Sequence, residues 1–470
     1  MKKSTTKMSL VASIAALVLC CAMLIGTTFA WFTDTASTAV NSIQAGKLDI
    51  ALEMKVNNEW VNAEGKTLSW VKAAGSENEA VLWEPGCTYR LPELRIVNNG
   101  NLALKYKIRI SGIVGDAELL DVISFTYGDG IDIDAEVSLA PLQATEGFII
   151  KGHMSESAGN EYQGLSIEGI AITVVATQDT FEHDSNGNQY DAGAKYPVLS
   201  DTEFAEAIAS AAAGDTITLS SGTFILPATA IPAGVVISGN GAANTAIVTN
   251  ADGYTIENDN VTIQNLTVDG RAASGVHYSG AINLRGNNAI LDNCVINGGG
   301  TGTWGASVYI NLNSGETAHI RNSIISGGFR GIFLGSQAGS VVVDSCDIDA
   351  VYPINVDGGG DFSLTVINSK LHGWTSYARI TSATFIDTEF SMGASGYDVV
   401  AAYTDTTFKN CTFDSAFKIY AQDQGFGFVF ENCMKDGVAV TAENFKTLFP
   451  EDPGVWTDCT CTVNGVAVTP

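Results

Sequence analysis

A short phrase repeated down the second half of the chain constrains the fold most strongly. Each copy has an apolar residue, a variable residue, a small polar residue that is usually Asn, a small residue, a variable residue and an apolar residue. The Asn-type positions are Asn265, Asn293, Asn322, Ser345, Asn368, Asp387, Asn410 and Asn432. A unit this short cannot bury its own apolar face, so we expect the copies to stack as a solenoid.

Alternating apolar residues within each phrase predict a strand, and the nearby Gly, Asn, Asp and Ser residues predict turns. A second family of alternating segments lies between the phrases, at 281–285, 307–311, 331–335, 353–357, 377–381, 398–402 and 416–420. Two or three short strands per turn, without a helical period, predict a parallel β-helix. A leucine-rich repeat has a similar period, but its Leu-x-x-Leu-x-Leu signature is missing.

The Asn column is expected to form a ladder of stacked side chains at a bend of each coil. The neighbouring column is mostly small and consists of Leu266, Cys294, Ser323, Cys346, Ser369, Thr388, Cys411 and Cys433. A buried free cysteine behaves as a small hydrophobic residue, which favours a packing role. We predict no metal site, because a zinc site requires paired ligands and Cys459-Thr-Cys461 is the sole close pair. A disulfide between neighbouring coils remains open.

Alternation in the second strand family predicts which side chains face outward. Ile282 and Leu284 and their equivalents should point inward, as should the apolar residues at 308, 310, 332, 334, 354 and 356. The outward columns are then Asn283, Tyr309, Phe333, Asn355, Arg379, Val400 and Lys418, and Arg285, Asn311, Gly335, Asp357, Thr381, Ala402 and Tyr420. The loops that lead to this face add Trp304, Arg330, Tyr352, Trp374 and Tyr377.

Aromatic rings beside Arg, Asn and Asp suit a sugar, because rings stack on sugar faces and planar polar groups bond hydroxyls or carboxylates. The candidate glycan-facing residues are Asn283, Arg285, Trp304, Tyr309, Asn311, Arg330, Asn355, Asp357 and Arg379. A lyase requires a positioned base beside a charge-neutralising group, and a glycosidase requires two spaced carboxylates. We assign no catalytic residue and no cofactor, and favour glycan binding or a structural stalk. The alternative is an extracellular polysaccharide lyase or hydrolase that acts on this face.

The segment 1–30 predicts a secretory signal peptide. Lys2, Lys3 and Lys7 precede an apolar run at 10–25, and small residues lead to Ala30. We therefore expect a secreted protein that meets a membrane only as its precursor. The chain has 24 basic and 51 acidic residues, a net charge of −27, which argues against nucleic acid as a partner.

Residues 31–180 lack the repeat, and their short strands and turns predict an antiparallel β-sandwich. Four phrases occur in order at 26–49, 85–86, 96–105 and 160–178, beginning Gly-Thr-Thr-Phe-Ala-Trp-Phe-Thr-Asp and including Ile-Val-Asn-Asn-Gly-Asn-Leu-Ala-Leu-Lys. This segment resembles the TasA and camelysin family of secreted jelly-roll proteins, which includes biofilm fibre subunits of Gram-positive bacteria.

The resemblance implies a freed N-terminal segment that can add as a strand to a neighbouring subunit, with Trp31, Phe32 and Asp34 in the assembly strand. It therefore implies self-assembly into fibres at the surface, or in the matrix, of a Gram-positive-type bacterium. The metalloprotease activity attributed to camelysin does not transfer, because the chain has no His-Glu-x-x-His motif. We expect residues 181–197 to form a polar linker rather than a calcium loop.

Residues 198–470 are expected to form the β-helix with an atypical C-terminal cap. A helix is predicted at 204–213, with Asp201 or Thr202 as N-cap, and it should cover the open first coil. The phrase at 213–224 resembles the N-terminal cap of pectate-lyase-like proteins, which implies a right-handed parallel β-helix. The predicted fold class is all-β: a jelly-roll-like sandwich followed by a parallel β-helix with an N-terminal capping helix.

Overall fold

The computed structural model describes most of the chain from Lys47 onward. The described residues are 47–470 apart from 67, 73–74, 76–80, 112–113, 169–170, 180–194, 251–252, 271–279, 299–304, 328, 336–337, 357–359, 379, 394–398, 415–416, 421–425, 451–458 and 469–470. The predicted signal peptide, the predicted assembly strand at 31–34 and most of the predicted linker therefore lie outside the described residues. Within the described part, no helix is long and apolar enough to cross a membrane.

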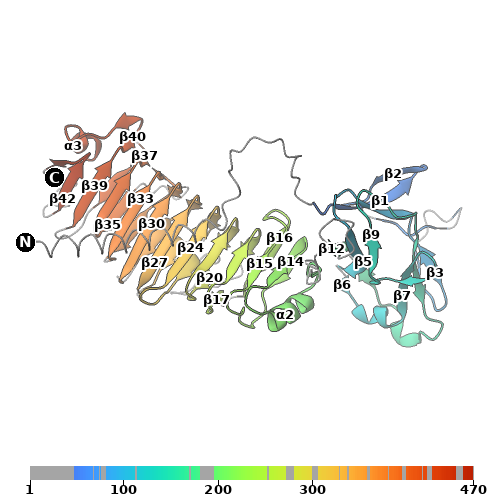
Figure 1. Ribbon diagram of the computed structural model, residues 1–470. Coiled ribbons are helices and arrows are strands. Elements are labelled where there is room, and N and C mark those ends of the chain that lie inside the picture. Colours follow the sequence, from blue (N-terminus) through green and yellow to red (C-terminus); the bar gives the residue numbers. More distant parts are fainter. Residues whose placement is uncertain are drawn as a thin grey trace, which may run out of the picture. The chain divides into compact units, whose positions relative to one another are not determined.

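Antiparallel sheets form the first part of the fold (Figure 1). Its main apolar core is accompanied by a smaller cluster around Leu119, Ile123 and Met154. Their strands are β1 (Ile50–Val56), β2 (Glu59–Asn62), β3 (Thr88–Arg90), β4 (Leu94–Asn98), β5 (Leu104–Ser111), β6 (Val114–Gly115), β7 (Ile123–Tyr127), β8 (Ile131–Asp132), β9 (Val137–Leu139), β10 (Ile150–Met154), β11 (Ile167–Glu168) and β12 (Ala171–Gln178). The sheet orders are β2-β1-β4, β3-β10-β7-β8, β11-β6 and β12-β5-β9. Leu94, Ile96, Leu104 and Ile108 are fully buried because alternate residues of β4 and β5 point into the core.

Three long sheets form the second part, a parallel β-solenoid that confirms the predicted architecture (Figure 1). The first sheet contains β13 (Thr216–Thr218), β15 (Val236–Ser238), β18 (Thr262–Gln264), β21 (Ala289–Asp292), β24 (Thr317–Arg321), β27 (Gly339–Asp344), β30 (Phe362–Ile367), β33 (Ser382–Ile386), β36 (Thr406–Lys409), β39 (Gly427–Glu431), β42 (Thr460–Val463) and β43 (Val466–Val468). The second contains β14 (Gly222–Ile225), β16 (Thr245–Val248), β19 (Thr267–Asp269), β22 (Val295–Gly298), β25 (Ile324–Gly327), β28 (Asp347–Asp349), β31 (Lys370–His372), β34 (Glu389–Ser391), β37 (Thr412–Phe413), β40 (Met434–Lys435) and β41 (Val438–Ala439). The third contains β17 (Tyr254–Ile256), β20 (Gly280–Leu284), β23 (Ala306–Ile310), β26 (Arg330–Leu334), β29 (Tyr352–Val356), β32 (Thr375–Ala378), β35 (Val399–Tyr403) and β38 (Lys418–Tyr420).

The repeated phrase forms the corner between a strand of the first sheet and the next strand of the second. Its eight Asn-type residues all have φ between 49° and 58°, the left-handed conformation that Asn and Asp tolerate better than other side chains. The ladder is also present: Asn293 Nδ2 donates to Asn265 Oδ1 at 2.8 Å, and Asn410 Nδ2 donates to Asp387 Oδ1 at 2.9 Å. The left-handed backbone conformation and the ladder of side-chain hydrogen bonds together explain why Asn predominates at these positions.

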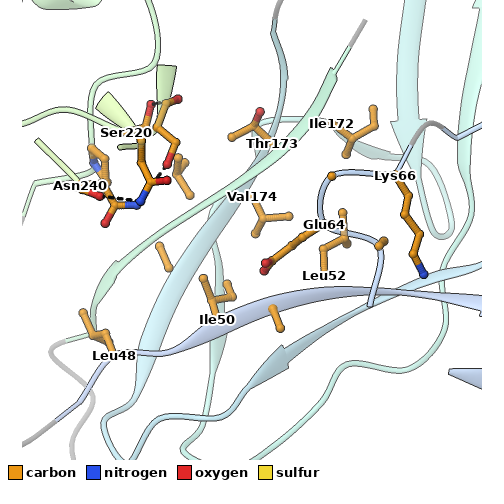
Figure 2. A pocket seen from close by; sticks show the side chains of 18 of the residues that line it. Leu48, Ile50, Leu52, Glu64, Lys66, Ile172, Thr173, Val174, Ser220 and Asn240 are labelled. Carbon is orange, nitrogen blue, oxygen red and sulfur yellow. Dashed lines mark hydrogen bonds between the residues drawn. The ribbon is translucent and has the colours of Figure 1, made fainter. Parts of the chain in front are cut away.

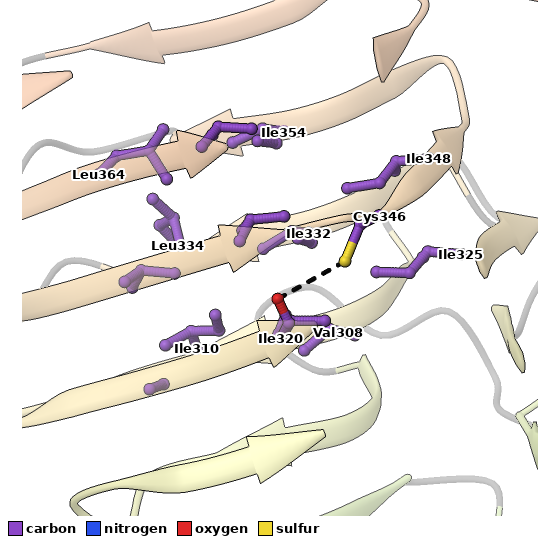
Figure 3. Close-up of a cluster of buried hydrophobic side chains, with 14 of the residues drawn as sticks. Val308, Ile310, Ile320, Ile325, Ile332, Leu334, Cys346, Ile348, Ile354 and Leu364 are labelled. Atoms are coloured by element: carbon purple, nitrogen blue, oxygen red, sulfur yellow. Dashed lines mark hydrogen bonds between the residues drawn. The ribbon is translucent and has the colours of Figure 1, made fainter. Parts of the chain in front are cut away.

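The column after each Asn packs inside the solenoid. All eight of its residues are buried, and the pKa values of Cys294 and Cys346 rise to about 12 because the thiols are buried. Figure 3 shows Cys346 among Ile320, Ile325 and Ile348, with its thiol donating to the Ile320 carbonyl at 3.5 Å. A thiol with so high a pKa is a poor nucleophile, which agrees with the predicted packing role.

A helix and a short C-terminal cap cover the two ends of the solenoid core. Helix α2 (Asp201–Ser210) buries Phe204 and Ile208 against the first coil. Its N-cap is Ser200, whose Oγ accepts a hydrogen bond from the Glu203 N–H at 3.2 Å, so the predicted Asp201 or Thr202 cap is wrong. The helix begins earlier in the sequence than expected. Ser200 has an extended backbone, and its Oγ can therefore reach this N–H. Helix α3 (Phe445–Leu448) belongs to the C-terminal cap.

Candidate functional site

The outer face of the third sheet holds one column of side chains that the strand register aligns. Asn283 pairs with Tyr309, Tyr309 with Phe333, and Phe333 with Asn355, along β20, β23, β26 and β29. The neighbouring apolar residues, such as Ile332 and Leu334, point into the core (Figure 3). The predicted alternation is therefore confirmed for these four strands.

Most of this column is buried, which corrects the expectation that the face is open to solvent. Asn283 is 4 % exposed, Tyr309 6 %, Phe333 1 % and Asn355 3 %, and Arg330 at the start of β26 is 1 % exposed. Period-two alternation separates the two faces of a strand, but it does not show whether the outer face is covered. A glycan-binding role for these residues remains a prediction, and it requires a ligand to reach groups that are already enclosed.

The enclosed polar groups bond to one another. Arg330 Nε donates to Asn355 Oδ1 at 2.5 Å, and its guanidinium lies 4.4 Å from the centre of the Phe333 ring. The Asn283 amide accepts from the Gly280 N–H at 2.7 Å and donates to Thr255 Oγ1 at 3.3 Å. Buried polar groups need such partners, so this network also stabilises the sheet.

The other predicted residues have different positions. Arg285 is exposed and pairs with Glu257 at 3.1 Å. Asn311 is half-buried, and its Oδ1 atom has no hydrogen-bond partner among the described residues. Trp304, Asp357 and Arg379 lie outside the described residues.

The outward assignment is wrong for β35, and Tyr377 of β32 does not line the outer face as predicted. Tyr377, Val400 and Ala402 are fully buried in the solenoid core, where Tyr377 pairs with Ala402 in neighbouring strands. β32 begins at Thr375, two residues before the predicted segment 377–381. In β35 the inward residues are Val400 and Ala402, one position after the predicted inward residues at 399 and 401. A one-residue shift exchanges the two faces of a strand. Lys418 is exposed as expected.

A ladder of three aromatic rings lies at the entry to the third sheet, and we call Phe329, Tyr352 and Trp374 the aromatic ladder. The ring centres of Phe329 and Tyr352 are 5.1 Å apart, and those of Tyr352 and Trp374 are 5.2 Å apart. All three side chains are partly exposed, and the Arg330 guanidinium lies 5.8 Å from the Phe329 ring. The aromatic ladder therefore presents ring surface to solvent, whereas the rings of Tyr309 and Phe333 are buried.

Sequence reasoning noted Tyr352 and Trp374 but missed Phe329. The signal was available, because the spacing of the three aromatics along the chain is close to the repeat of the Asn column. Residues at the repeat spacing occupy equivalent positions in successive coils. Aromatic residues at that spacing therefore predict neighbouring rings in contact, here edge to face between Phe329 and Tyr352 and tilted between Tyr352 and Trp374.

The described residues offer few groups suited to acid–base chemistry at this face. Burial raises the pKa of Tyr377, whose hydroxyl lies 3.2 Å from Thr406 Oγ1, so this phenol stays protonated at neutral pH. Among the described residues, no group of three or more His, Cys, Asp or Glu is arranged to hold a metal ion. His153, His319 and His372 lie on three different sheets.

The sandwich carries a second candidate surface at the edge of its sheets. Figure 2 shows the apolar side chains of Ile50 and Leu52 of β1 and of Ile172 and Val174 of β12 on one side of the sandwich. These four apolar side chains are only partly buried. Among the strands that the structure describes, β12 comes at one end of the order β12-β5-β9. An end strand beside apolar surface is a template for an added strand.

Comparison with known families identifies the start of the chain. Residues 5–63 match the family model described as Camelysin metallo-endopeptidase. Over these residues the chain is similar to the camelysin family. The match confirms the predicted resemblance and includes β1 and β2. No curated protein matches the chain.

Solved structures with a related fold include proteins that act on polysaccharides. The A-module of a mannuronan C-5 epimerase from Azotobacter vinelandii is 12% identical over 50% of this chain and 83% of its own, with a TM-score of 0.31. A pectin methylesterase from Erwinia chrysanthemi is 12% identical over 53% and 92%, with a TM-score of 0.31. A PL6 alginate lyase is 11% identical over 50% and 62%, with a TM-score of 0.32. Likenesses this distant indicate neither a substrate nor a reaction for this chain.

Proposed function

We propose that this chain is an exported cell-surface or biofilm-matrix protein of a Gram-positive-type bacterium. In this proposal the sandwich assembles or anchors the protein, and the solenoid is a stalk that binds glycan. The camelysin-type match at 5–63 and the apolar run at 10–25 support export.

The observation that carries the glycan proposal is the aromatic ladder. Its rings lie 5.1 and 5.2 Å apart along the solenoid and keep part of their surface exposed. Rigid aromatic surface binds the apolar face of a sugar ring and loses little conformational entropy. The rings belong to successive coils, so an extended glycan can follow the solenoid axis. A net charge of −27 repels polyanions, and we therefore expect a neutral glycan.

The test is binding of the purified full chain to an array of neutral and acidic glycans. Trp374→Ala and Tyr352→Leu should weaken binding by about tenfold each, because each removes one stacking ring. Trp60→Ala is the matched control, since this ring lies over Arg95 in the sandwich, 4.6 Å from its guanidinium carbon. Unchanged binding in both ladder variants, with circular dichroism that shows folded protein, would contradict the proposal.

The assembly proposal rests on the partly buried apolar edge of the sandwich. A strand that pairs with β12 would use the edge of its sheet, and apolar side chains of the added strand could cover Ile172 and Val174. The camelysin resemblance suggests that residues 31–34 supply part of that strand from a neighbouring copy. Deletion of 31–34 should abolish fibre assembly and surface retention, whereas an equally long deletion at 185–188 should not. Wild-type assembly by the 31–34 deletion would show that the strand comes from elsewhere.

The alternative is a polysaccharide lyase or hydrolase acting on the outer face of the third sheet. The structure favours it less, because Arg330 is enclosed and engaged with Asn355, while Arg285 is paired with Glu257. Release of unsaturated or reducing ends from an acidic polysaccharide would support this alternative. Loss of that release in Arg285→Ala or Arg330→Ala would locate the site.

A further inference from the structure

Two cysteines occupy equivalent positions in successive coils near the C-terminal end of the solenoid. Cys411 directly precedes β37 and Cys433 directly precedes β40. The strand register pairs Thr412 with Met434, so the two cysteines are one step before paired residues. The Met434 N–H also donates to the Cys411 carbonyl at 2.9 Å. The two side chains therefore start from stacked backbone positions.

The geometry suits a covalent bond between the coils. Neighbouring strands lie about 4.8 Å apart, and disulfides join Cα atoms separated by about 4.4–6.8 Å. The preceding residues, Asn410 and Asn432, share a φ of 53°, so both chains leave the corner in the same direction. Both thiols point into the core, where Cys411 is 0% and Cys433 2% exposed. Their Sγ atoms make equivalent hydrogen bonds, to the carbonyl oxygens of the paired residues Phe385 and Phe408, each at 3.4 Å.

The other cysteines of the column lack this arrangement. Cys294 and Cys346 lie two coils apart, with Ser323 between them. The backbone N–H of Cys294 donates to Ser323 Oγ at 3.1 Å, and that of Cys346 donates to Ser369 Oγ at 3.1 Å. In this column, therefore, only the last two coils place one thiol directly beside another.

We propose that Cys411 and Cys433 form a disulfide that joins two successive coils when the chain folds in the presence of a small-molecule disulfide such as oxidised glutathione. One thiolate attacks oxidised glutathione, which gives a mixed disulfide and releases one glutathione thiolate. The second cysteine, as thiolate, then attacks the mixed disulfide, forms the Cys411–Cys433 bond and releases the second glutathione. The protein loses two electrons and two protons, and oxidised glutathione becomes two glutathione thiols.

The position of the pair indicates what such a bond does. Each coil of a solenoid contacts only its neighbours, so the terminal coils open most easily. Cys433 belongs to the coil that carries β39 and β40, and the C-terminal cap follows directly. A bond to the preceding coil closes a loop that is one coil long and limits the unfolded states of this end. Burial raises the pKa of Cys411, so exchange should be slow in the folded protein and faster during folding or opening of the end.

The test is to refold the full chain to equilibrium in a mixture of reduced and oxidised glutathione. Alkylation under denaturing conditions and peptide mass analysis then identify the remaining thiols. We expect a peptide linked through 411 and 433, and a thermal midpoint a few degrees above that of the same protein reduced with dithiothreitol. Hydrogen exchange should slow mainly in β37, β39 and β40.

Two serine variants distinguish this pair from a general effect of cysteine. Cys433→Ser should abolish both the linked peptide and the difference in midpoint. Cys346→Ser should retain both, because serine already occupies this column in the two neighbouring coils, at Ser323 and Ser369. Reduced Cys411 and Cys433 at equilibrium, or a different pairing in the refolded native protein, would overturn the proposal. This result is independent of glycan binding and of assembly.

Discussion

The two halves of the solenoid have the same backbone repeat but different cores. One inward column of the first sheet has aliphatic residues in its first five phrase-bearing coils and phenylalanine in the last three, and it contains Ile263, Leu291, Ile320, Val343, Val366, Phe385, Phe408 and Phe430. The rings stack, with centres 5.4 Å apart for Phe385 and Phe408 and 5.0 Å apart for Phe408 and Phe430. The column two residues earlier has the small residues Ala383 and Thr406 beside the first two rings and Phe428 beside the third. Corner geometry and register are thus retained while the core chemistry changes.

The comparison shows that the corner, rather than the identity of the core residues, defines the coil. Asn265 in the aliphatic half and Asn432 in the aromatic half have φ values of 58° and 53°. Any set of apolar side chains that fills the interior at normal density can then be accommodated between the sheets. The two halves should consequently differ in their sensitivity to core substitutions and agree in their sensitivity to corner substitutions.

The largest expected effect is in the aromatic half. Phe408→Ala removes a fully buried ring that stacks on two others and should lower the free energy of unfolding by about 3–5 kcal/mol. Ile320→Ala, the matched truncation in the same column of the aliphatic half, should cost about 2–5 kcal/mol and less than Phe408→Ala, because no stacked ring is lost. Urea unfolding followed by circular dichroism measures both. Equal costs would mean that the stacked rings add nothing to the stability of their half.

The next effect concerns the C-terminal end. Lys435 is buried, and its Nζ donates to the carbonyl oxygens of Phe417 and Leu448, each at 2.6 Å. Lys435→Met should cost about 2–3 kcal/mol, because two buried acceptors lose a charged donor. Hydrogen exchange should accelerate around α3. The exposed Lys418→Met is the control, and a similar loss in that variant would point to charge rather than to the buried contacts.

A corner substitution should have a smaller effect that is the same in both halves. Asn410→Ala and Asn293→Ala should each cost about 1–2 kcal/mol, because alanine adopts positive φ unfavourably. Asn410→Gly should cost less, since glycine adopts this conformation readily. Thermal unfolding of the three variants provides the comparison. If Asn410→Ala left the stability unchanged, the preference for Asn at the corner would have a cause other than backbone conformation.

The smallest effect is expected at the N-terminal end. Ser200→Ala removes the hydrogen bond to the Glu203 N–H and should cost about 1 kcal/mol. Ser200→Asp should restore most of the stability, since Asp is also a favourable N-cap. Hydrogen exchange should accelerate in α2 and β13 and stay unchanged near α3. Faster exchange at both ends would show that the solenoid opens as a single cooperative unit.

Much of the fold could be predicted because its information is local and repeated. Asn at a regular spacing indicates a recurring corner, and alternation around Ile332 and Leu334 indicates which residues fill the core. The prediction failed where the pattern weakened, as at Tyr377 and Val400, because flanking apolar residues allowed two registers that differ by one position.

The candidate site was less predictable because it depends on what covers a strand. Arg330 and Asn355 lie on the outer face as expected, yet both are enclosed. The aromatic ladder could have been found in part, since Phe329 and Tyr352 are separated by a repeat length. The exposed fraction of each ring follows from packing between segments far apart in the sequence, and it has no local signature.

The sequence by itself determined a solenoid with Asn corners, small residues beside them, a preceding antiparallel segment and a likeness to the camelysin family over residues 5–63. These features follow from backbone conformation and hydrophobic periodicity, which act over a few residues. The tertiary structure decided that Arg330 is enclosed, that three aromatic rings form a ladder and that Cys411 and Cys433 occupy stacked positions in successive coils. Those outcomes depend on the strand register between neighbouring coils and on which side chains cover each strand. Both are determined only when all the coils stack in the assembled domain.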